Sequence, residues 1–240
     1  MIDKLTDPLL SLLYPQQCRV CAGPVHHRAD GVSCDGCWAH TRIFDGSEMR
    51  CDKCGLLMGD TAAPVAVRCH KCDEHHYDRA YTIGVYEKGL ATNILELKKT
   101  PQLPSRLWQL IRSATLPDAD LIIPAPLSKS RRLERGFNQA ELIAEAISRS
   151  TRIPLDTHSL ERRLPTHVHR VGMDDKAREL SVRNVFSVSR PKLINARRVL
   201  FVDDVFTSGA TASGCAKVLK KSGATEVNVF TLARAVWRSS

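Results

Sequence analysis

A run of four apolar residues followed by two carboxylates constrains the fold of this 240-residue chain more than any other stretch. The apolar run covers residues 199–202, and the carboxylates are Asp203 and Asp204. Uninterrupted apolar side chains are typical of a strand buried on both faces, as in a parallel sheet covered by helices. A hydroxyl-rich segment with one glycine follows at 207–211, and we expect a helix to begin behind it. The sequence therefore predicts an α/β protein whose ligand site lies at the carboxyl end of this strand.

The chemistry of this segment indicates a ligand that carries both a phosphate and a sugar. Backbone N–H groups, the hydroxyls of Thr207, Ser208 and Thr211, and a helix N-terminus are all suited to phosphate. Two carboxylates would repel that phosphate, but Asp203 and Asp204 can accept hydrogen bonds from two sugar hydroxyls.

Thirteen consecutive residues, 199–211, resemble the phosphoribosyl pyrophosphate (PRPP) motif of type I phosphoribosyltransferases. The resemblance implies that the two acids meet the ribose hydroxyls and that the loop wraps the 5′-phosphate. By it, the PRPP-binding residues are Asp203, Asp204, Thr207, Ser208, Gly209, Ala210 and Thr211. Two other classes contain an apolar strand that ends in Asp-Asp. P-loop nucleoside triphosphatases also need a G-x-x-x-x-G-K-S/T segment, which this chain lacks. Receiver domains carry the strand near their start, whereas here it lies in the last 42 of 240 residues.

Eight of the nine cysteines form four C-x-x-C pairs within the first 72 residues. The pairs are Cys18/Cys21, Cys34/Cys37, Cys51/Cys54 and Cys69/Cys72. Each pair can place two thiolates on one zinc ion, and a second pair completes a tetrahedral, closed site. In a cytosolic chain this pattern indicates metal rather than disulfides. We therefore expect two structural Zn²⁺ ions with four cysteine ligands each. The spacing favours sequential pairing and leaves a cross-braced arrangement open.

The remaining pattern alternates between strands and helices. Strands are expected at 80–86, 120–123, 199–202 and 226–235, and helices at 90–99, 104–114, 140–149 and 209–222. This alternation predicts a mostly parallel sheet with helices on both faces. We expect a double zinc ribbon over residues 1–78 and a phosphoribosyltransferase-like domain over 79–240.

A second motif follows the strand at 120–123. It reads Pro124-Ala125-Pro126-Leu127, then Arg131, then Arg135-Gly136-Phe137-Asn138-Gln139-Ala140. On a helix, Arg131 and Arg135 would share one face and could grip one anion, although a solvated basic helix has the same pattern. Together with the cysteine pairs and the PRPP-type stretch, this motif resembles the ComF/GntX family, in which a zinc ribbon is fused to a phosphoribosyltransferase domain.

The family resemblance implies further site residues and partners. The pyrophosphate loop and its basic flank would be Ala125, Pro126, Leu127, Ser128, Arg131 and Arg135, and Arg178 would lie in a flap over the site, within residues 150–185. It implies Mg²⁺ bound with PRPP, a role in natural competence and DNA uptake, and a competence helicase as a partner.

Charge and composition leave two function classes open. Residues 1–78 hold 8 Lys/Arg against 11 Asp/Glu, a charge of −3, and residues 79–240 hold 27 against 15, a charge of +12, so the second part accounts for the positive net charge of +9. A basic surface suits either a polyphosphate substrate or single-stranded DNA, and an ordinary solvated surface looks the same. The chain is therefore an enzyme with an unidentified acceptor, or a non-catalytic protein that handles single-stranded DNA. The sequence shows no membrane span or secretory signal, and we expect a cytoplasmic protein.

Overall fold

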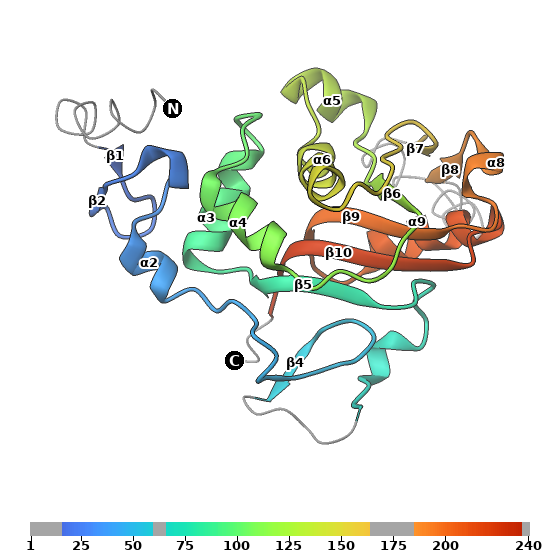
Figure 1. Cartoon of the computed structure of the whole chain (residues 1–240), viewed down its shortest axis with the longest axis horizontal. Helices are drawn as coiled ribbons and strands as arrows, with labels where there is room; N and C mark the ends of the chain where they lie inside the picture. The colour runs from blue at the N-terminus through green and yellow to red at the C-terminus, as the bar shows by residue number, and fades with distance from the viewer. Residues whose placement is uncertain (1–15, 60–65, 164–184, 237–240) are drawn as a thin grey trace, which may run out of the picture.

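The computed structural model describes residues 16–59, 66–163 and 185–236. Its central sheet has four strands in the order β5-β10-β9-β6, all parallel (Figure 1). Their bounds are Ala80–Val85 for β5, Leu121–Pro124 for β6, Arg198–Phe206 for β9 and Glu226–Arg234 for β10. The expected fold class, a parallel sheet flanked by helices, is confirmed.

The central strand β9 is buried on both faces, as its apolar run predicts. Val199 and Phe201 belong to one hydrophobic cluster, and Leu200 and Val202 belong to a second cluster on the opposite face. All four side chains are at most 1% exposed. Because burying one such side chain stabilises a fold by about 1.5–3 kcal/mol, this strand anchors both halves of the core.

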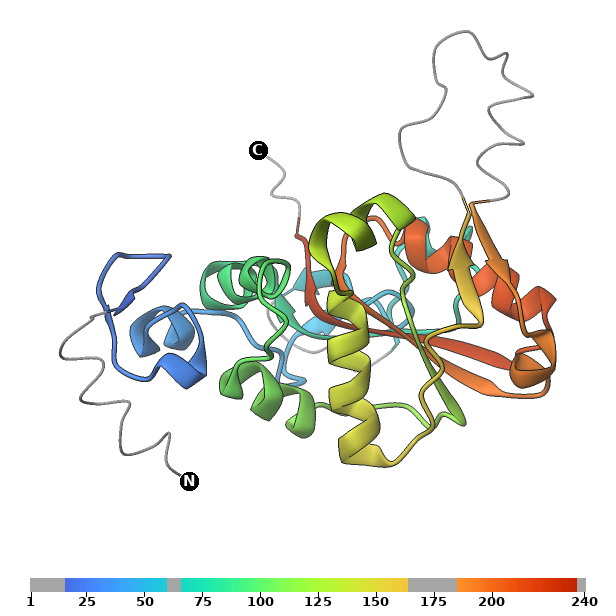
Figure 2. The same cartoon turned by 90° about the horizontal axis from the view of Figure 1, so that it is seen from above.

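Helices cover both faces of the sheet (Figures 1 and 2). One face packs against α3 (Lys88–Leu97), α4 (Ser105–Ser113) and α6 (Gln139–Thr151). The other packs against α8 (Pro191–Ile194) and α9 (Ala210–Lys221). Cys215, the one cysteine outside the four pairs, lies on the buried side of α9 with no exposed surface and is a small core residue.

The first ribbon lies beside α3 and α4 (Figure 1). It contains β1 (Gln16–Gln17), β2 (Pro24–Val25), η1 (Arg28–Asp30) and α2 (Asp35–Ala39). Asn93 of α3 is fully buried at this contact. Its Oδ1 accepts a hydrogen bond from the Val32 N–H at 3.0 Å, and its Nδ2 donates to Ser33 Oγ at 3.0 Å. One amide side chain therefore fastens the ribbon to the helix.

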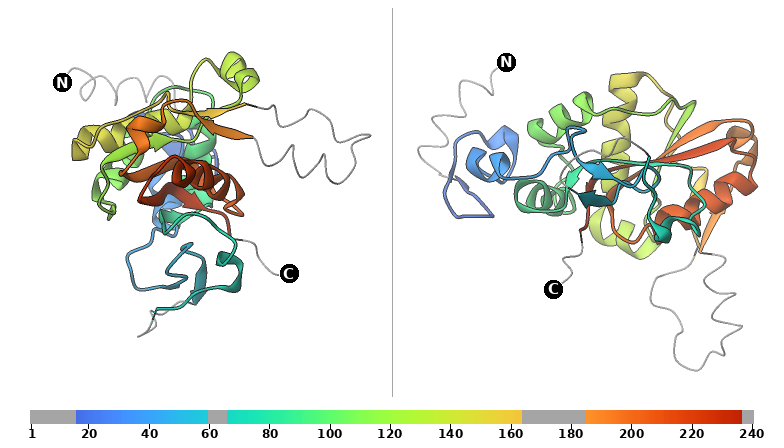
Figure 3. Two further views of the ribbon diagram at one scale, coloured as in Figure 1. Left: turned by 90° about the vertical axis from the view of Figure 1, so that its right-hand side faces the viewer. Right: turned by 90° about the horizontal axis from the view of Figure 1, so that it is seen from below.

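The second ribbon lies against the β5 edge of the sheet (Figures 1 and 3). It contains β3 (Met49–Arg50), β4 (Leu57–Gly59) and η2 (His70–Cys72). The segment before it pairs with β5 at Ile43 and Gly84, where a Cβ on Gly84 would lie 2.4 Å from the Arg42 carbonyl oxygen. Glycine at position 84 thus permits a backbone approach that covers the exposed sheet edge.

A short helix and a strand pair complete the edge of the molecule where the strands end. Helix α5 covers Lys129–Arg135, and β7 (Leu160–Arg162) pairs antiparallel with β8 (Phe186–Val188). The expected flap residue Arg178 falls between β7 and β8 and lies outside the described residues. Within the described part of the chain, no helix is long and apolar enough to cross a membrane.

Candidate functional site

The two loops singled out by sequence lie at the same edge of the sheet. Strands β6 and β9 are parallel neighbours, with Pro124 opposite Val202. The Ala125 N–H donates to the Val202 carbonyl oxygen at 2.7 Å, so the segment 125–128 leaves the sheet directly beside Asp203. Segment 207–211 leaves the end of β9 and opens α9. Ligands of open α/β sheets bind at this carboxyl edge.

The loop at 207–211 is shaped by its glycine. Gly209 has φ +81° and precedes α9, a conformation that favours glycine over other residues. The side chains of Thr207, Ser208 and Thr211 are exposed around it. A small cavity of about 30 Å³ lies between this loop, Asp203 and β10.

Thr231 lines the same cavity and was not found by sequence reasoning. It lies opposite Asp203 in the β9–β10 register and is 1% exposed, yet its hydroxyl has no hydrogen-bond partner among the described residues. A buried hydroxyl without a partner costs stability, so this threonine offers a free donor and acceptor to a bound group. Only the strand register, which a sequence does not show, places it beside the acid pair.

The first acid of the pair, Asp203, has a pKa well above the ordinary value of an aspartate. Asp203 accepts a hydrogen bond from the Asp204 N–H at 2.8 Å. Burial, together with the adjacent negative charge of Asp204, raises the pKa of Asp203 to about 8. Hydroxyl groups of a ligand that donate hydrogen bonds to Asp203 would favour its charged form and lower this pKa.

The second acid is held by two residues that sequence reasoning did not place in the site. Lys98, which follows the last residue of α3, pairs with Asp204 at 2.9 Å, and Gln139 Nε2 donates to Asp204 Oδ2 at 3.4 Å. Arg135 Nη1 in turn donates to Gln139 Oε1 at 3.1 Å. This polar chain joins α5, α6, β9 and α3 across the site. Gln139 was visible as part of the second motif, whereas nothing local in the sequence marks Lys98.

The segment 125–128 is fixed from behind by Asn138. Its Nδ2 donates to the Ala125 carbonyl oxygen at 2.9 Å, and its Oδ1 accepts from the Ala140 N–H as the N-cap of α6. Ser128 caps α5 in the same manner, accepting from the Arg131 N–H at 3.4 Å. Part of the motif that follows β6 therefore serves to fix the conformation of segment 125–128.

The structure brings the two arginines of the basic flank onto α5 but gives them different surroundings. Arg131 is exposed, whereas Arg135 is half-buried and contacts Gln139. Arg132, between them, pairs with Glu141. Arg131 is thus available to an incoming anion, while Arg135 already supports the polar chain to Asp204.

The eight paired cysteines form two separate cages. One contains Cys18, Cys21, Cys34 and Cys37, and the other contains Cys51, Cys54, Cys69 and Cys72. The pairing is therefore sequential, which settles the choice that spacing left open. Sulfur–sulfur distances are 3.6 Å for Cys21–Cys34 and 3.3–3.7 Å in the second cage. A tetrahedral zinc site with Zn–S bonds of about 2.3 Å places its sulfurs about 3.8 Å apart, so both cages fit structural Zn²⁺.

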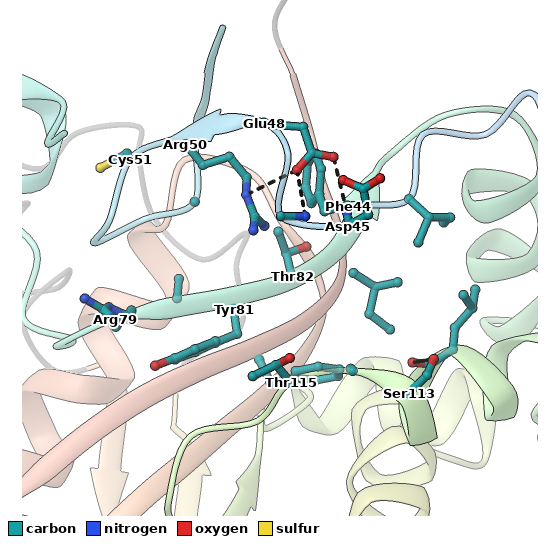
Figure 4. A pocket seen from close by; sticks show the side chains of 18 of the residues that line it. Phe44, Asp45, Glu48, Arg50, Cys51, Arg79, Tyr81, Thr82, Ser113 and Thr115 are labelled. Atoms are coloured by element: carbon teal, nitrogen blue, oxygen red, sulfur yellow. Dashed lines mark hydrogen bonds and ion pairs between the residues drawn. The ribbon is translucent and has the colours of Figure 1, made fainter. Parts of the chain in front are cut away.

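A second cavity, shown in Figure 4, is lined by residues outside these loops. It measures about 560 Å³ and lies between the second ribbon, β5 and the end of α4. Within it, Glu48 accepts hydrogen bonds from the N–H groups of Asp45 and Gly46 and pairs with Arg50, while the buried Thr82 hydroxyl has no hydrogen-bond partner among the described residues. Neither the 199–211 stretch nor the 124–140 motif contributes a residue to this cavity, so the sheet edge with the acid pair is the candidate functional site.

Comparison with known proteins finds similarity both in the zinc-ribbon region and over nearly the whole chain. A model of the double zinc ribbon domain matches residues 9–73. Competence protein F of Haemophilus influenzae is 33% identical over 234 residues, covering 91% of this chain and 97% of that protein. The DNA utilization protein YhgH of Escherichia coli is 28% identical over 93% of this chain and 99% of that protein. Among solved structures, a glutamine PRPP amidotransferase from B. subtilis is 24% identical, with a TM-score of 0.39 over 52% of this chain and 25% of that one.

The similarity to Competence protein F extends over nearly the full length of both chains. The architecture agrees with the family expected from the motifs, since a zinc-ribbon region precedes a parallel sheet flanked by helices. The chain therefore belongs to the ComF family of competence proteins.

Proposed function

We propose that this protein binds PRPP together with Mg²⁺ at the carboxyl edge of its sheet and transfers the phosphoribosyl group to an acceptor that has not been identified. The observation that carries the proposal is the juxtaposition of two loops with complementary chemistry. Segment 125–128 starts beside Asp203 of β9, and segment 207–211 starts at the end of β9. PRPP has a pyrophosphate, a ribose and a 5′-phosphate, and the edge offers a place for each.

The residues would divide the ligand between them. Segment 207–211 would bind the 5′-phosphate with backbone N–H groups, hydroxyls and the start of α9. Asp203 and Asp204 would accept hydrogen bonds from the ribose hydroxyls, after Lys98 leaves Asp204 or turns toward a phosphate. Segment 125–128, with the exposed Arg131 beside it, would hold the pyrophosphate.

The proposed reaction breaks the bond between the anomeric carbon and pyrophosphate and forms a bond from that carbon to the acceptor. Pyrophosphate leaves, and the transition state resembles an oxocarbenium ion, as in other glycosyl transfers. Bound Mg²⁺ would supply charge neutralisation of the leaving group. The chain would supply orientation, because the ribose and the pyrophosphate would be held at the ends of two adjacent strands. This scheme requires no protein nucleophile.

The names of the relatives support an association with DNA uptake and use, since they are a competence protein and a DNA utilization protein. A non-catalytic protein that handles single-stranded DNA, with a competence helicase as partner, is the alternative. In either case we propose that residues 1–78 form the zinc-ribbon part and residues 79–240 the phosphoribosyltransferase-like part.

Calorimetric titration of the protein with PRPP and Mg²⁺ tests the proposal. We expect saturable binding that Asp204→Asn weakens about tenfold or more, because a hydrogen bond to a charged acceptor is lost. Asp118→Asn is the matched control: this acid is 89% exposed and precedes β6, at the opposite edge of the sheet, and its loss should leave the affinity unchanged. Absence of binding by the wild-type protein, or equal effects of the two variants, would contradict the proposal.

Two further assays separate the proposed reaction from the alternative. Pyrophosphate release from PRPP, measured with a panel of nucleobases, would identify the acceptor class. Oligonucleotide binding that weakens steeply with salt, in a protein that releases no pyrophosphate with any acceptor, would favour the DNA-handling function.

A further inference from the structure

We infer that the second zinc cage supports segment 207–211, which we call the phosphate loop. Zinc binding in this cage would therefore control ligand binding at the phosphate loop, whereas the first cage has no such role. The inference rests on the proposed function for its ligand, but its structural core can be tested without PRPP. It assigns positioning roles to Arg234, Phe206 and His75, none of which is among the site residues expected from the sequence.

The first link joins the cage to the end of β9. Arg234 lies at the end of β10 and is 6% exposed. Its guanidinium donates to the Cys54 carbonyl oxygen, and its Nη2 lies 3.5 Å from Cys54 Sγ. The same guanidinium stacks on the Phe206 ring, with its carbon 4.5 Å from the ring centroid. Four thiolates around a divalent ion leave a net negative charge, which favours this buried cation.

The second link joins Phe206 to the loop itself. Phe206 is 4% exposed and ends β9 immediately before Thr207. A Cβ on Gly209 would lie 2.7 Å from Phe206 Cζ and 3.3 Å from His75 Nε2. The backbone of the loop therefore rests directly on one ring from the sheet and one ring from the ribbon.

The residues after the last cysteine pair extend this support. Tyr77 is 1% exposed and meets the Phe206 ring edge to face, with centroids 5.8 Å apart, while His75 stacks on Tyr77 at 5.1 Å. The His76 N–H donates to Ser213 Oγ of α9 at 3.1 Å. The segment that closes the second cage thus contacts both the loop and the first turns of the helix behind it.

The two cages differ in exposure and in what they touch. All four cysteines of the second cage are buried and belong to the hydrophobic cluster that includes Phe206 and α9. In the first cage Cys21 is exposed, and the surrounding ribbon is fastened to α3 through Asn93. Loss of a metal ion should therefore destabilise the phosphate loop only when the ion leaves the second cage.

Removing one cysteine from each cage tests this asymmetry. Cys72→Ser and Cys21→Ser should each reduce the zinc count by one ion in native mass spectrometry. In ligand-free protein, we expect hydrogen exchange of the peptide that contains residues 207–211 to accelerate about tenfold or more in the Cys72→Ser protein and to stay unchanged in the Cys21→Ser protein. Equal loop exchange in the two variants would overturn the inference.

Phe206→Leu tests the link if Cys72→Ser does not fold. This variant keeps every cysteine, so both zinc ions should remain, while exchange in the loop rises relative to exchange in β9. Retained zinc with unchanged loop protection would refute the coupling.

The reciprocal measurement uses PRPP and a chelator. Coupling between two sites is mutual, so PRPP with Mg²⁺ should slow zinc loss from the second cage and leave the first cage unaffected. If PRPP binds without slowing that loss, the inference fails and the proposed function stands. If PRPP does not bind, the proposed function fails, and hydrogen exchange in ligand-free protein still decides the structural coupling.

Discussion

The raised pKa of Asp203 predicts that Asp203→Asn makes the protein more stable relative to the wild type as the pH rises, while it weakens PRPP binding. Burial and the charge of Asp204 raise the pKa of Asp203 to about 8 in the folded protein, while an unfolded aspartate ionises at its ordinary value of 3.8. Between these values folding takes up a proton, so Asp203 makes the protein less stable as the pH rises through this window. Asp203→Asn removes the titration and keeps the side-chain oxygen that accepts from the Asp204 N–H.

The magnitude follows from the number of protons. Uptake of one full proton corresponds to about 1.4 kcal/mol per pH unit, which sets a ceiling of about 2.7 kcal/mol between about pH 5 and pH 7. Asp203 retains some exposed surface, so water offsets part of the cost of its charge. We therefore expect the difference in the free energy of unfolding between Asp203→Asn and the wild type to shift by about 1–2 kcal/mol in favour of the variant as the pH rises over this range.

Urea unfolding of both proteins in parallel measures this difference and cancels the pH dependence of the cysteine cages. The same variant should bind PRPP more weakly, because it loses a carboxylate proposed to accept a ribose hydroxyl. Stability curves that run parallel from pH 5 to pH 7 would refute the assignment of a raised pKa to Asp203.

Three other substitutions test contacts around the site and the ribbons. Lys98→Met should lower the free energy of unfolding by about 1–2 kcal/mol in urea, because Asp204 is only 10% exposed and loses its cation; an unchanged midpoint would show that Asp204 does not depend on this pair. Asn93→Ala should cost about 1–3 kcal/mol and speed proteolysis within the first ribbon, since the buried Val32 N–H loses its acceptor and Ser33 keeps only its contact with Thr92; unaltered cleavage would contradict that role. Gly84→Ala should reduce thermal stability, because the new Cβ meets the Arg42 carbonyl oxygen, and a melting temperature equal to the wild type would exclude this close approach.

The fold was predictable where local pattern and burial agree. The apolar run at 199–202 indicated a strand covered on both faces, and its residues divide between the two hydrophobic clusters as expected. Gly209 and the hydroxyls that follow β9 indicated a loop before a helix, and α9 begins at Ala210. These features depend on neighbours in sequence, so a single sequence is enough to find them.

The rest depends on contacts between distant segments. The four C-x-x-C pairs are chemically equivalent, so only the tertiary structure shows which pairs share a cage. Lys98 reaches Asp204 across more than 100 residues of sequence, and Thr231 reaches the cavity through strand register. His75 also escapes local pattern: it is half-buried beneath Gly209 of segment 207–211, and no described histidine joins a cage.

A crystal of the protein soaked with PRPP and Mg²⁺ would show directly whether and where this ligand binds. We expect ribose hydroxyls on Asp203 and Asp204, the 5′-phosphate within segment 207–211, and the pyrophosphate against segment 125–128. A structure in which this edge stays empty, with Lys98 still bound to Asp204, would contradict this expectation.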